Sequence, residues 1–330
     1  MHPSSLRGDV SSSSSSVVVR TQETQIVLPA DPIAAVRRAF GDPRPLGVDA
    51  VWQKPFDYDT GHLQRLAVLS PEAAAAPEDL IAYALDFKYE QIQKDLLLHV
   101  LPFCLRAWQE DLASPFGRYE AFVDELYPAL LRGGLFDGVL NQREADAVSD
   151  FMREAILGQI DAQQSLSFKG SKGSAYAWFH ALSTYGLLRA DIEPLWSTWW
   201  AVETPGRALA AAQYASCLIY DETANPVFDA WTREHGVGPP CLWHYRGHVL
   251  EERWRDANLE MLERTLTPEG VRGLLDRAVA RLTGHPLRDK AASIRFHLDA
   301  RTETLAKRCA DVRRFLATPN EVEYSFSWSP

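Results

Sequence analysis

Residues 92–112 read IQKDLLLHVLPFCLRAWQEDL, and this stretch decides the fold class. Every fourth residue in it is apolar, in the row Ile92, Leu96, Val100, Cys104, Trp108 and Leu112, and three more leucines lie beside that row. A stripe this wide is typical of a helix that is buried on much of its circumference. Because proline lacks a backbone donor, we expect a kink at Pro102 or a meeting of two helices there.

Helix starts are marked along the rest of the chain by a capping residue directly before a proline. The five pairs are Asp31-Pro32, Ser70-Pro71, Thr204-Pro205, Asn225-Pro226 and Thr267-Pro268. A short polar side chain at the N-cap accepts a bond from an orphan backbone N–H, and proline at the first helical position has no N–H to leave unpaired. Asn141 with Glu144 forms the pattern of a capping box and predicts a further start.

These signals, with apolar residues at helical spacing between them, predict an all-α fold. We expect helices near residues 32–40, 71–112, 119–131, 141–160, 175–189, 192–201, 205–220, 226–235, 241–265, 268–283 and 287–317. The last of these turns Ile294, Leu298, Leu305, Cys309, Val312 and Leu316 inward. Successive amphipathic helices with short connections indicate an irregular bundle or a solenoid-like array of about ten helices.

The chain divides into three parts by composition. Residues 1–23 are serine-rich and are expected to form a disordered tail, residues 24–236 a helical domain, and residues 237–330 a C-terminal helical extension packed on it. Residues 321–328 alternate between polar and apolar, with Tyr324, Phe326 and Trp328 on one face, which is typical of a strand. This strand-like tail either docks on its own domain or binds a partner.

Charge and cysteine content narrow the function classes. The net charge of −10 argues against a nucleic-acid binder, although Pro286–Leu316 holds eight Lys/Arg against four Asp/Glu. That basic segment, with Arg308, Arg313 and Arg314, either lies against an acidic body or binds an acidic partner. Four dispersed cysteines indicate a reduced, cytoplasmic protein, and no apolar run reaches the length of a membrane span.

The strongest pattern for chemistry is formed by Cys241, His244 and His248 with Glu251 or Glu252. On a helix these residues share one face, and a thiolate, two imidazoles and a carboxylate would suit zinc. The alternative is a packing face, since aromatic residues surround this segment. No cofactor is otherwise predicted.

Two loops and one aromatic cluster complete the candidates. Asp57–His62 and Lys169–Ser174 are read as a capped turn and a linker, because neither has the strand that an aspartic protease loop or a phosphate-binding loop requires. Trp196, Trp199 and Trp200 lie on one side of a short helix, where they serve either as core or as a partner-binding surface.

A family resemblance rests on three stretches: His99-Val100-Leu101-Pro102 with Arg106-Ala107-Trp108, the helix Asn141–Ile160, and Asp191–Leu195 followed by Trp199 and an alanine-rich helix. Over about residues 30–220 the chain resembles an uncharacterised bacterial all-helical family with a Leu-Pro helix motif. The resemblance implies an all-helical fold and carries no activity.

The absence of a catalytic signature favours a cytoplasmic protein-interaction or scaffold protein that holds another protein, rather than an enzyme. The alternative is a metal-binding enzyme or regulator that uses the cluster at Cys241, His244 and His248.

Overall fold

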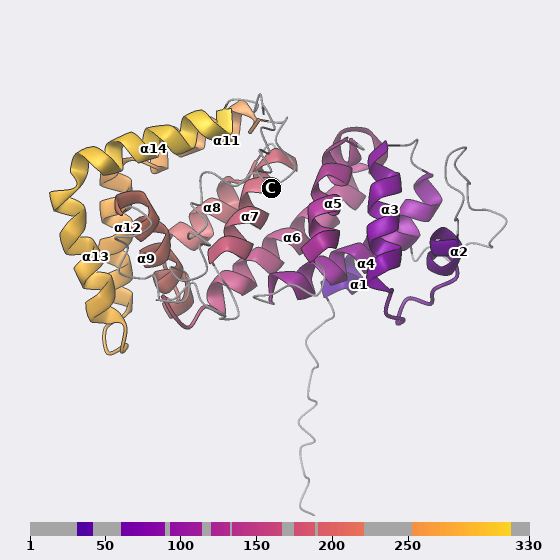
Figure 1. Cartoon of the computed structure of the whole chain (residues 1–330), viewed down its shortest axis with the longest axis horizontal. Helices are drawn as coiled ribbons and strands as arrows, with labels where there is room; N and C mark the ends of the chain where they lie inside the picture. The colour runs from indigo at the N-terminus through magenta and orange to yellow at the C-terminus, as the bar shows by residue number, and fades with distance from the viewer. Residues whose placement is uncertain are drawn as a thin grey trace, which may run out of the picture. The chain divides into compact units, whose positions relative to one another are not determined.

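The computed structural model describes residues 32–41, 61–89, 93–113, 120–132, 134–166, 175–188, 191–220 and 253–317. Within these ranges it contains thirteen α-helices, one π-helical turn and no strand, which confirms the all-α prediction (Figure 1). The elements are α1 (Pro32–Phe40), α2 (Gly61–Ala67), α3 (Pro77–Tyr89), α4 (Lys94–Leu112), α5 (Glu120–Arg132), the π-turn η2 (Leu135–Val139), α6 (Gln142–Asp161), α7 (Ala175–Leu188), α8 (Glu193–Trp200), α9 (Pro205–Ile219), α11 (Asp256–Thr265), α12 (Pro268–Arg281), α13 (Arg288–Ala300) and α14 (Thr302–Ala317).

Three of the expected helix starts carry the expected caps. The Thr204 hydroxyl accepts from the Arg207 N–H at 3.2 Å, and the Thr267 hydroxyl accepts from the Gly270 N–H at 3.0 Å. At the start of α6, Asn141 and Glu144 form a complete capping box. Each cap satisfies backbone donors that the helix itself leaves unpaired.

The expected helix start at Pro71 is wrong. Residues 71–76 form a turn and an irregular segment, and α3 begins at Pro77. A helix that continued from Pro71 through Pro77 would lose a backbone hydrogen bond at Pro77 and bring its ring against the preceding turn. Pro77 is therefore tolerated only at the start of the helix.

The single helix expected over 287–317 is also wrong, because α13 and α14 are separated at Arg301. The backbone of Arg301 leaves the helical region, with φ −122° and ψ 30°. All six residues expected to face inward, from Ile294 to Leu316, are nevertheless buried. In contrast, α4 runs without a break through Pro102.

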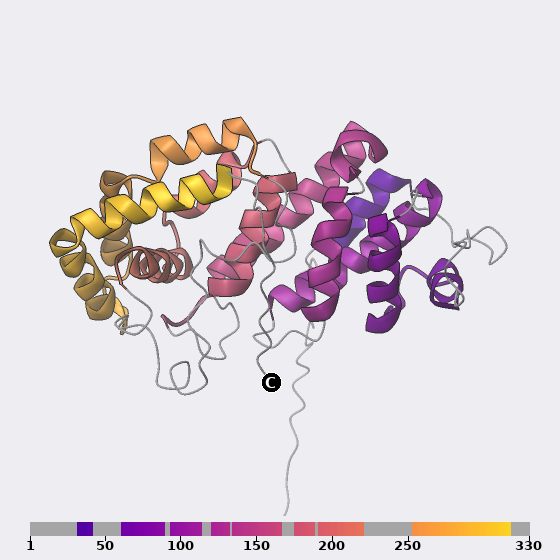
Figure 2. The same cartoon turned by 45° about the horizontal axis from the view of Figure 1, so that its top comes forward.

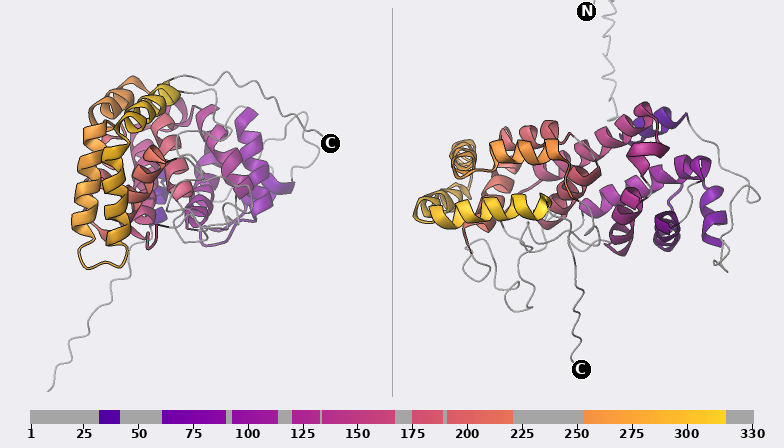
Figure 3. Two further views of the ribbon diagram at one scale, coloured as in Figure 1. Left: turned by 60° about the vertical axis from the view of Figure 1, so that its left-hand side comes forward. Right: turned by 90° about the horizontal axis from the view of Figure 1, so that it is seen from above.

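The helices form two groups around two central helices. In the first, which we call the α4 group, α4 contacts α1, α2 and α5, and α3 packs on α2 and α5. In the second, the α9 group, α9 contacts α8, α12, α13 and α14, and α11 packs on α14. Figure 2 and the right-hand view of Figure 3 show α11 and α14 side by side.

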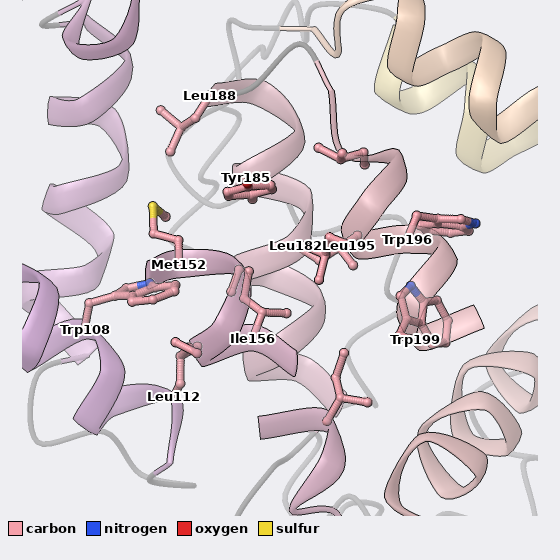
Figure 4. Close-up of a cluster of buried hydrophobic side chains, with 14 of the residues drawn as sticks. Trp108, Leu112, Met152, Ile156, Leu182, Tyr185, Leu188, Leu195, Trp196 and Trp199 are labelled. Carbon is pink, nitrogen blue, oxygen red and sulfur yellow. The ribbon is translucent and has the colours of Figure 1, made fainter. Parts of the chain in front are cut away.

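Helices α6 and α7 belong to neither group, because each contacts both α4 and α9. Figure 4 shows Met152 of α6 and Leu182 of α7 lying between Trp108 of α4 and Trp199 of α8. The buried apolar side chains form one continuous core through this region. The two groups thus share a core, and the joint between them is built from α6 and α7.

The segment that leads into α11 packs against α7, at the joint between the two groups. Trp254 is 1% exposed, and a Cβ added at Gly186 of α7 would lie 2.4 Å from its indole ring. Asn258 of α11 accepts from the Ile192 N–H at 3.1 Å and donates to the Gly186 carbonyl at 2.9 Å. These contacts hold α11 against the end of α7 and the start of α8.

Candidate functional site

The three clustered tryptophans of α8 are buried, with exposed fractions of 1% for Trp196, 0% for Trp199 and 8% for Trp200. Trp196 stacks on Trp200 with ring centroids 4.9 Å apart, and Trp199 meets Tyr214 of α9 edge to face at 5.6 Å. Aromatic pairs in these arrangements add stability beyond their buried area. In this structure the cluster joins α8 to α9, so its rings are covered and do not form an exposed surface.

The C-terminal carbonyl groups of α9 are capped by Arg308 of α14 and by Arg301, the residue between α13 and α14. Arg308 donates to the Cys217 carbonyl at 3.0 Å and also to the Tyr220 carbonyl, while the Arg301 side chain donates to the Ile219 carbonyl at 3.0 Å. A cation at this end of a helix pairs with the last free carbonyl groups and with the negative end of the helix dipole. Arg308 is therefore bound within the chain itself.

The other two predicted arginines are placed differently. Arg314 is exposed and pairs with Asp311, one turn earlier on α14, at 3.0 Å. Arg313 is half-buried near the Cys309 thiol. Burial raises the pKa of this thiol to about 12, and the positive charge of Arg313 offsets part of the rise. The structure thus separates the three residues into one helix-capping side chain, one half-buried side chain and one surface side chain.

A second pair of arginine caps was missed by the sequence analysis. Arg277 of α12 donates to the Trp200 carbonyl at 3.0 Å, and Arg281 donates to the Val202 carbonyl at 3.3 Å. Val202 has a φ of 58° and is 2% exposed, a conformation that a β-branched residue rarely adopts. The two arginines hold the tight turn between α8 and α9, and helical spacing alone does not indicate their targets.

Tyr220, which follows α9, is bound by polar side chains of the C-terminal helices. Its hydroxyl bonds with His297 Nδ1, and the Arg301 guanidinium lies 4.8 Å from its ring centroid. Burial raises the pKa of Tyr220, and the Arg301 charge opposes this. In this structure the phenol thus serves as a hydrogen-bonding group that joins the end of α9 to α13.

The start of α9 forms an ionic junction with the end of α6. Asp161 accepts from Thr204 Oγ1 at 2.5 Å and from Arg207 Nη2 at 2.9 Å, and Arg207 Nη1 donates to the Thr198 carbonyl at 3.0 Å. A Cβ at Gly206 would lie 2.2 Å from the Asp161 carbonyl oxygen, so only glycine allows this approach. The Thr204-Pro205 cap was the only sequence signal for this junction.

No three His, Cys, Asp or Glu side chains come together to hold a metal ion within the residues that the structure describes. Cys241, His244, His248 and Glu251 lie outside those residues, and so do Tyr324, Phe326 and Trp328, Asp57–Thr60 and Lys169–Ser174. The zinc site and the aromatic tail therefore stay predictions. Elemental analysis of the purified full chain, with Cys241→Ser as the comparison, tests the first.

The chain matches no family model, no curated protein and no solved structure. None of the described helices combines the length and the apolar character needed to cross a bilayer.

Proposed function

We propose that this chain is a cytoplasmic protein-interaction or scaffold protein that holds another protein through the outer surface of α13 and α14. The observation that carries the proposal is the position of Phe296 on α13, where 75% of its surface is exposed. By comparison, the three tryptophans of α8 are almost fully buried. Aromatic residues and arginine are enriched at the centres of protein–protein interfaces.

Cations exposed on the same two helices support a partner with acidic groups. Lys290 of α13, and Lys307 and Arg314 of α14, are exposed. In contrast, Arg301 and Arg308 are bound to carbonyl groups of α9. Lys307 and Arg314 are therefore the residues with which to test partner binding, and a change at Arg308 would test folding.

The experiment is affinity purification of the tagged full chain from its native cell. We expect one specific partner, whose recovery falls when Phe296→Ala or the pair Lys307→Glu and Arg314→Glu is introduced. Deletion of residues 321–330 tests the predicted contribution of Tyr324, Phe326 and Trp328. The matched controls are Leu85→Ala, an exposed apolar residue on α3, and Arg153→Glu on α6.

Each variant is first checked by thermal unfolding, so that a loss of binding is separated from a loss of fold. Recovery of the chain alone, or equal recovery of the partner with the α13–α14 variants and with the controls, would contradict the proposal. If deletion of 321–330 abolishes binding while Phe296→Ala does not, the tail is the binding element and the surface of α13 is not.

A further inference from the structure

Phe296, the exposed aromatic residue of α13, is one end of a row of three rings. Its ring meets the His297 ring edge to face with centroids 5.7 Å apart, and the His297 ring meets the Tyr220 ring in the same way at 5.9 Å. Phe296 is 75% exposed, His297 is half-buried and Tyr220 is 5% exposed. The row therefore leads from the surface of α13 inward to the end of α9.

The imidazole of His297 is oriented by the innermost residue of this row. The Tyr220 hydroxyl bonds with His297 Nδ1. A tyrosine hydroxyl keeps its proton at neutral pH and can donate it to Nδ1, and the neutral imidazole then carries its own proton on Nε2. The imidazolium form carries a proton on Nε2 as well. Because Nδ1 is taken by Tyr220, Nε2 is the donor that His297 has left for a partner.

The charges around His297 favour an acceptor that is an anion. The Arg301 guanidinium lies 4.8 Å from the Tyr220 ring centroid and donates to the Ile219 carbonyl, which is a neutral acceptor, so this bond leaves its positive charge in place. Asp299, the acidic residue closest to His297 in the sequence, pairs with Arg272 and with Arg295. A hydrogen bond from an imidazole to a carboxylate is also stronger than one to a neutral acceptor.

We propose that this row is the part of α13 that contacts the partner, and that it binds a protein segment in which a carboxylate lies next to an apolar side chain. The apolar side chain packs on the Phe296 ring, and the carboxylate accepts from His297 Nε2 close to the Arg301 charge. Tyr220 is a positioning residue, because it is buried and acts only through the imidazole that it orients. This assignment rests on the proposed function and names the chemistry of its partner.

Peptide selection on the full chain tests the assignment without the natural partner. A phage-displayed library of random peptides is selected on the immobilised protein. We expect the enriched sequences to share an Asp or Glu within two positions of an apolar residue. One enriched peptide is then synthesised twice, as selected and with its acid replaced by the corresponding amide. Phe296→Ala should weaken the binding of both peptides, whereas Leu85→Ala, the exposed apolar control on α3, should not.

Tyr220→Phe tests the positioning role, with thermal unfolding as the check on the fold. A hydrogen bond to a charged group corresponds to a preference of about tenfold for the acid peptide over the amide peptide. In Tyr220→Phe and in His297→Phe this preference should fall close to one, while the affinity for the amide peptide is kept. A structural role alone would weaken both peptides equally.

Three results would overturn the assignment: no enriched peptide or enriched peptides without an acid, equal binding to Phe296→Ala and Leu85→Ala, or a preference for the acid that survives in both Tyr220→Phe and His297→Phe. Recovery of the chain alone from its native cell would instead count against the proposed function. The two failures are therefore distinguishable.

Discussion

The α4 and α9 groups are each built around one buried helix, yet these two helices are buried by different means. Helix α4 fills its surroundings with large side chains, such as Leu101, Phe103 and Trp108. Helix α9 is rich in alanine, and every residue from Gly206 to Ile219 is buried. Helices α8, α12, α13 and α14 pack on α9. Arginines from α12, from α14 and from the break between α13 and α14 bind carbonyl groups at its end and at the turn before it. The α4 group thus depends on side-chain volume, and the α9 group on close approach of its helices and on capped helix ends.

The largest effect is expected from loss of volume in the α4 group. Trp108 is fully buried, and its indole N–H donates to the Tyr127 hydroxyl at 2.7 Å. Replacing a buried tryptophan by alanine typically costs about 3–5 kcal/mol of unfolding free energy. Denaturant unfolding of Trp108→Ala measures this. Tyr127→Phe, which removes the hydroxyl and keeps the ring, should cost less, and equal losses for the two variants would contradict the dependence on volume.

In the α9 group the next largest effect should come from an arginine. Arg308→Ala leaves the Cys217 and Tyr220 carbonyls without their cation, and hydrogen bonds to charged groups are worth about 1.5–3 kcal/mol. Arg314→Ala is the control, because this arginine is exposed and its ion pair with Asp311 lies within one helix, where such pairs contribute about 0.3–0.5 kcal/mol. Equal unfolding free energies for the two variants would show that the caps on α9 are not stabilising.

Added volume should harm the α9 group where it would not harm a surface helix. Ala211 is fully buried in α9, and overpacking of a tight site costs about 1–3 kcal/mol. Ala306→Leu, on the exposed side of α14, is the matched control. If Ala211→Leu melts at the temperature of the control, α9 is not closely packed, and the contrast with α4 fails.

A smaller effect is expected at the helix cap of α12, the helix that supplies Arg277 and Arg281. Thr267→Ala removes the acceptor for the Gly270 N–H, and such caps are worth about 1 kcal/mol. Thr267→Ser keeps the hydroxyl and should retain most of the stability. Thermal unfolding of the two variants side by side separates the cap from the rest of the side chain.

The smallest effect on stability is expected from the buried thiols, one of which lies in each helix group. Burial raises the pKa of Cys104 in α4 and raises that of Cys309 in α14 to about 12. The Cys309 thiol ionises near pH 9 in the unfolded chain and near pH 12 in the fold. At neutral pH it is protonated in both states and does not change the stability, whereas between pH 9 and 12 only the unfolded state loses the proton, so the fold is destabilised.

At pH 8 both thiols should resist a thiol reagent until their helices open. In variants that keep one cysteine each, we expect faster labelling at Cys309 than at Cys104, because α14 covers α9 from outside while α4 is central to its own group. Equal labelling rates would indicate that the two groups open as one unit.

Helix starts could be predicted from the sequence because a cap is a local signal, as Thr204, Thr267 and Asn141 show. The predicted start at Pro71 was wrong because Pro77, a few residues later, also suits the first helical position and is the one that the helix uses. The break at Arg301 has no glycine or proline to mark it.

The arginine caps could not be predicted, since Arg308 and the Cys217 carbonyl are 91 residues apart and their contact exists only in the folded chain. The burial of the α8 tryptophans could not be predicted either, because their spacing places them on one face of the helix and does not indicate which helix covers that face.

The caps of α9 also have a consequence for synthesis on the ribosome. Arg308 is translated 91 residues after Cys217, and at about 5–20 residues per second this delay lasts roughly 5–20 s. During that time α9 and the helices α6, α7 and α8 that contact it have been made, while α12, α13 and α14, which also pack on it, have not yet emerged. The nascent chain therefore passes through a period in which a chaperone, or premature pairing with another nascent chain, competes for α9.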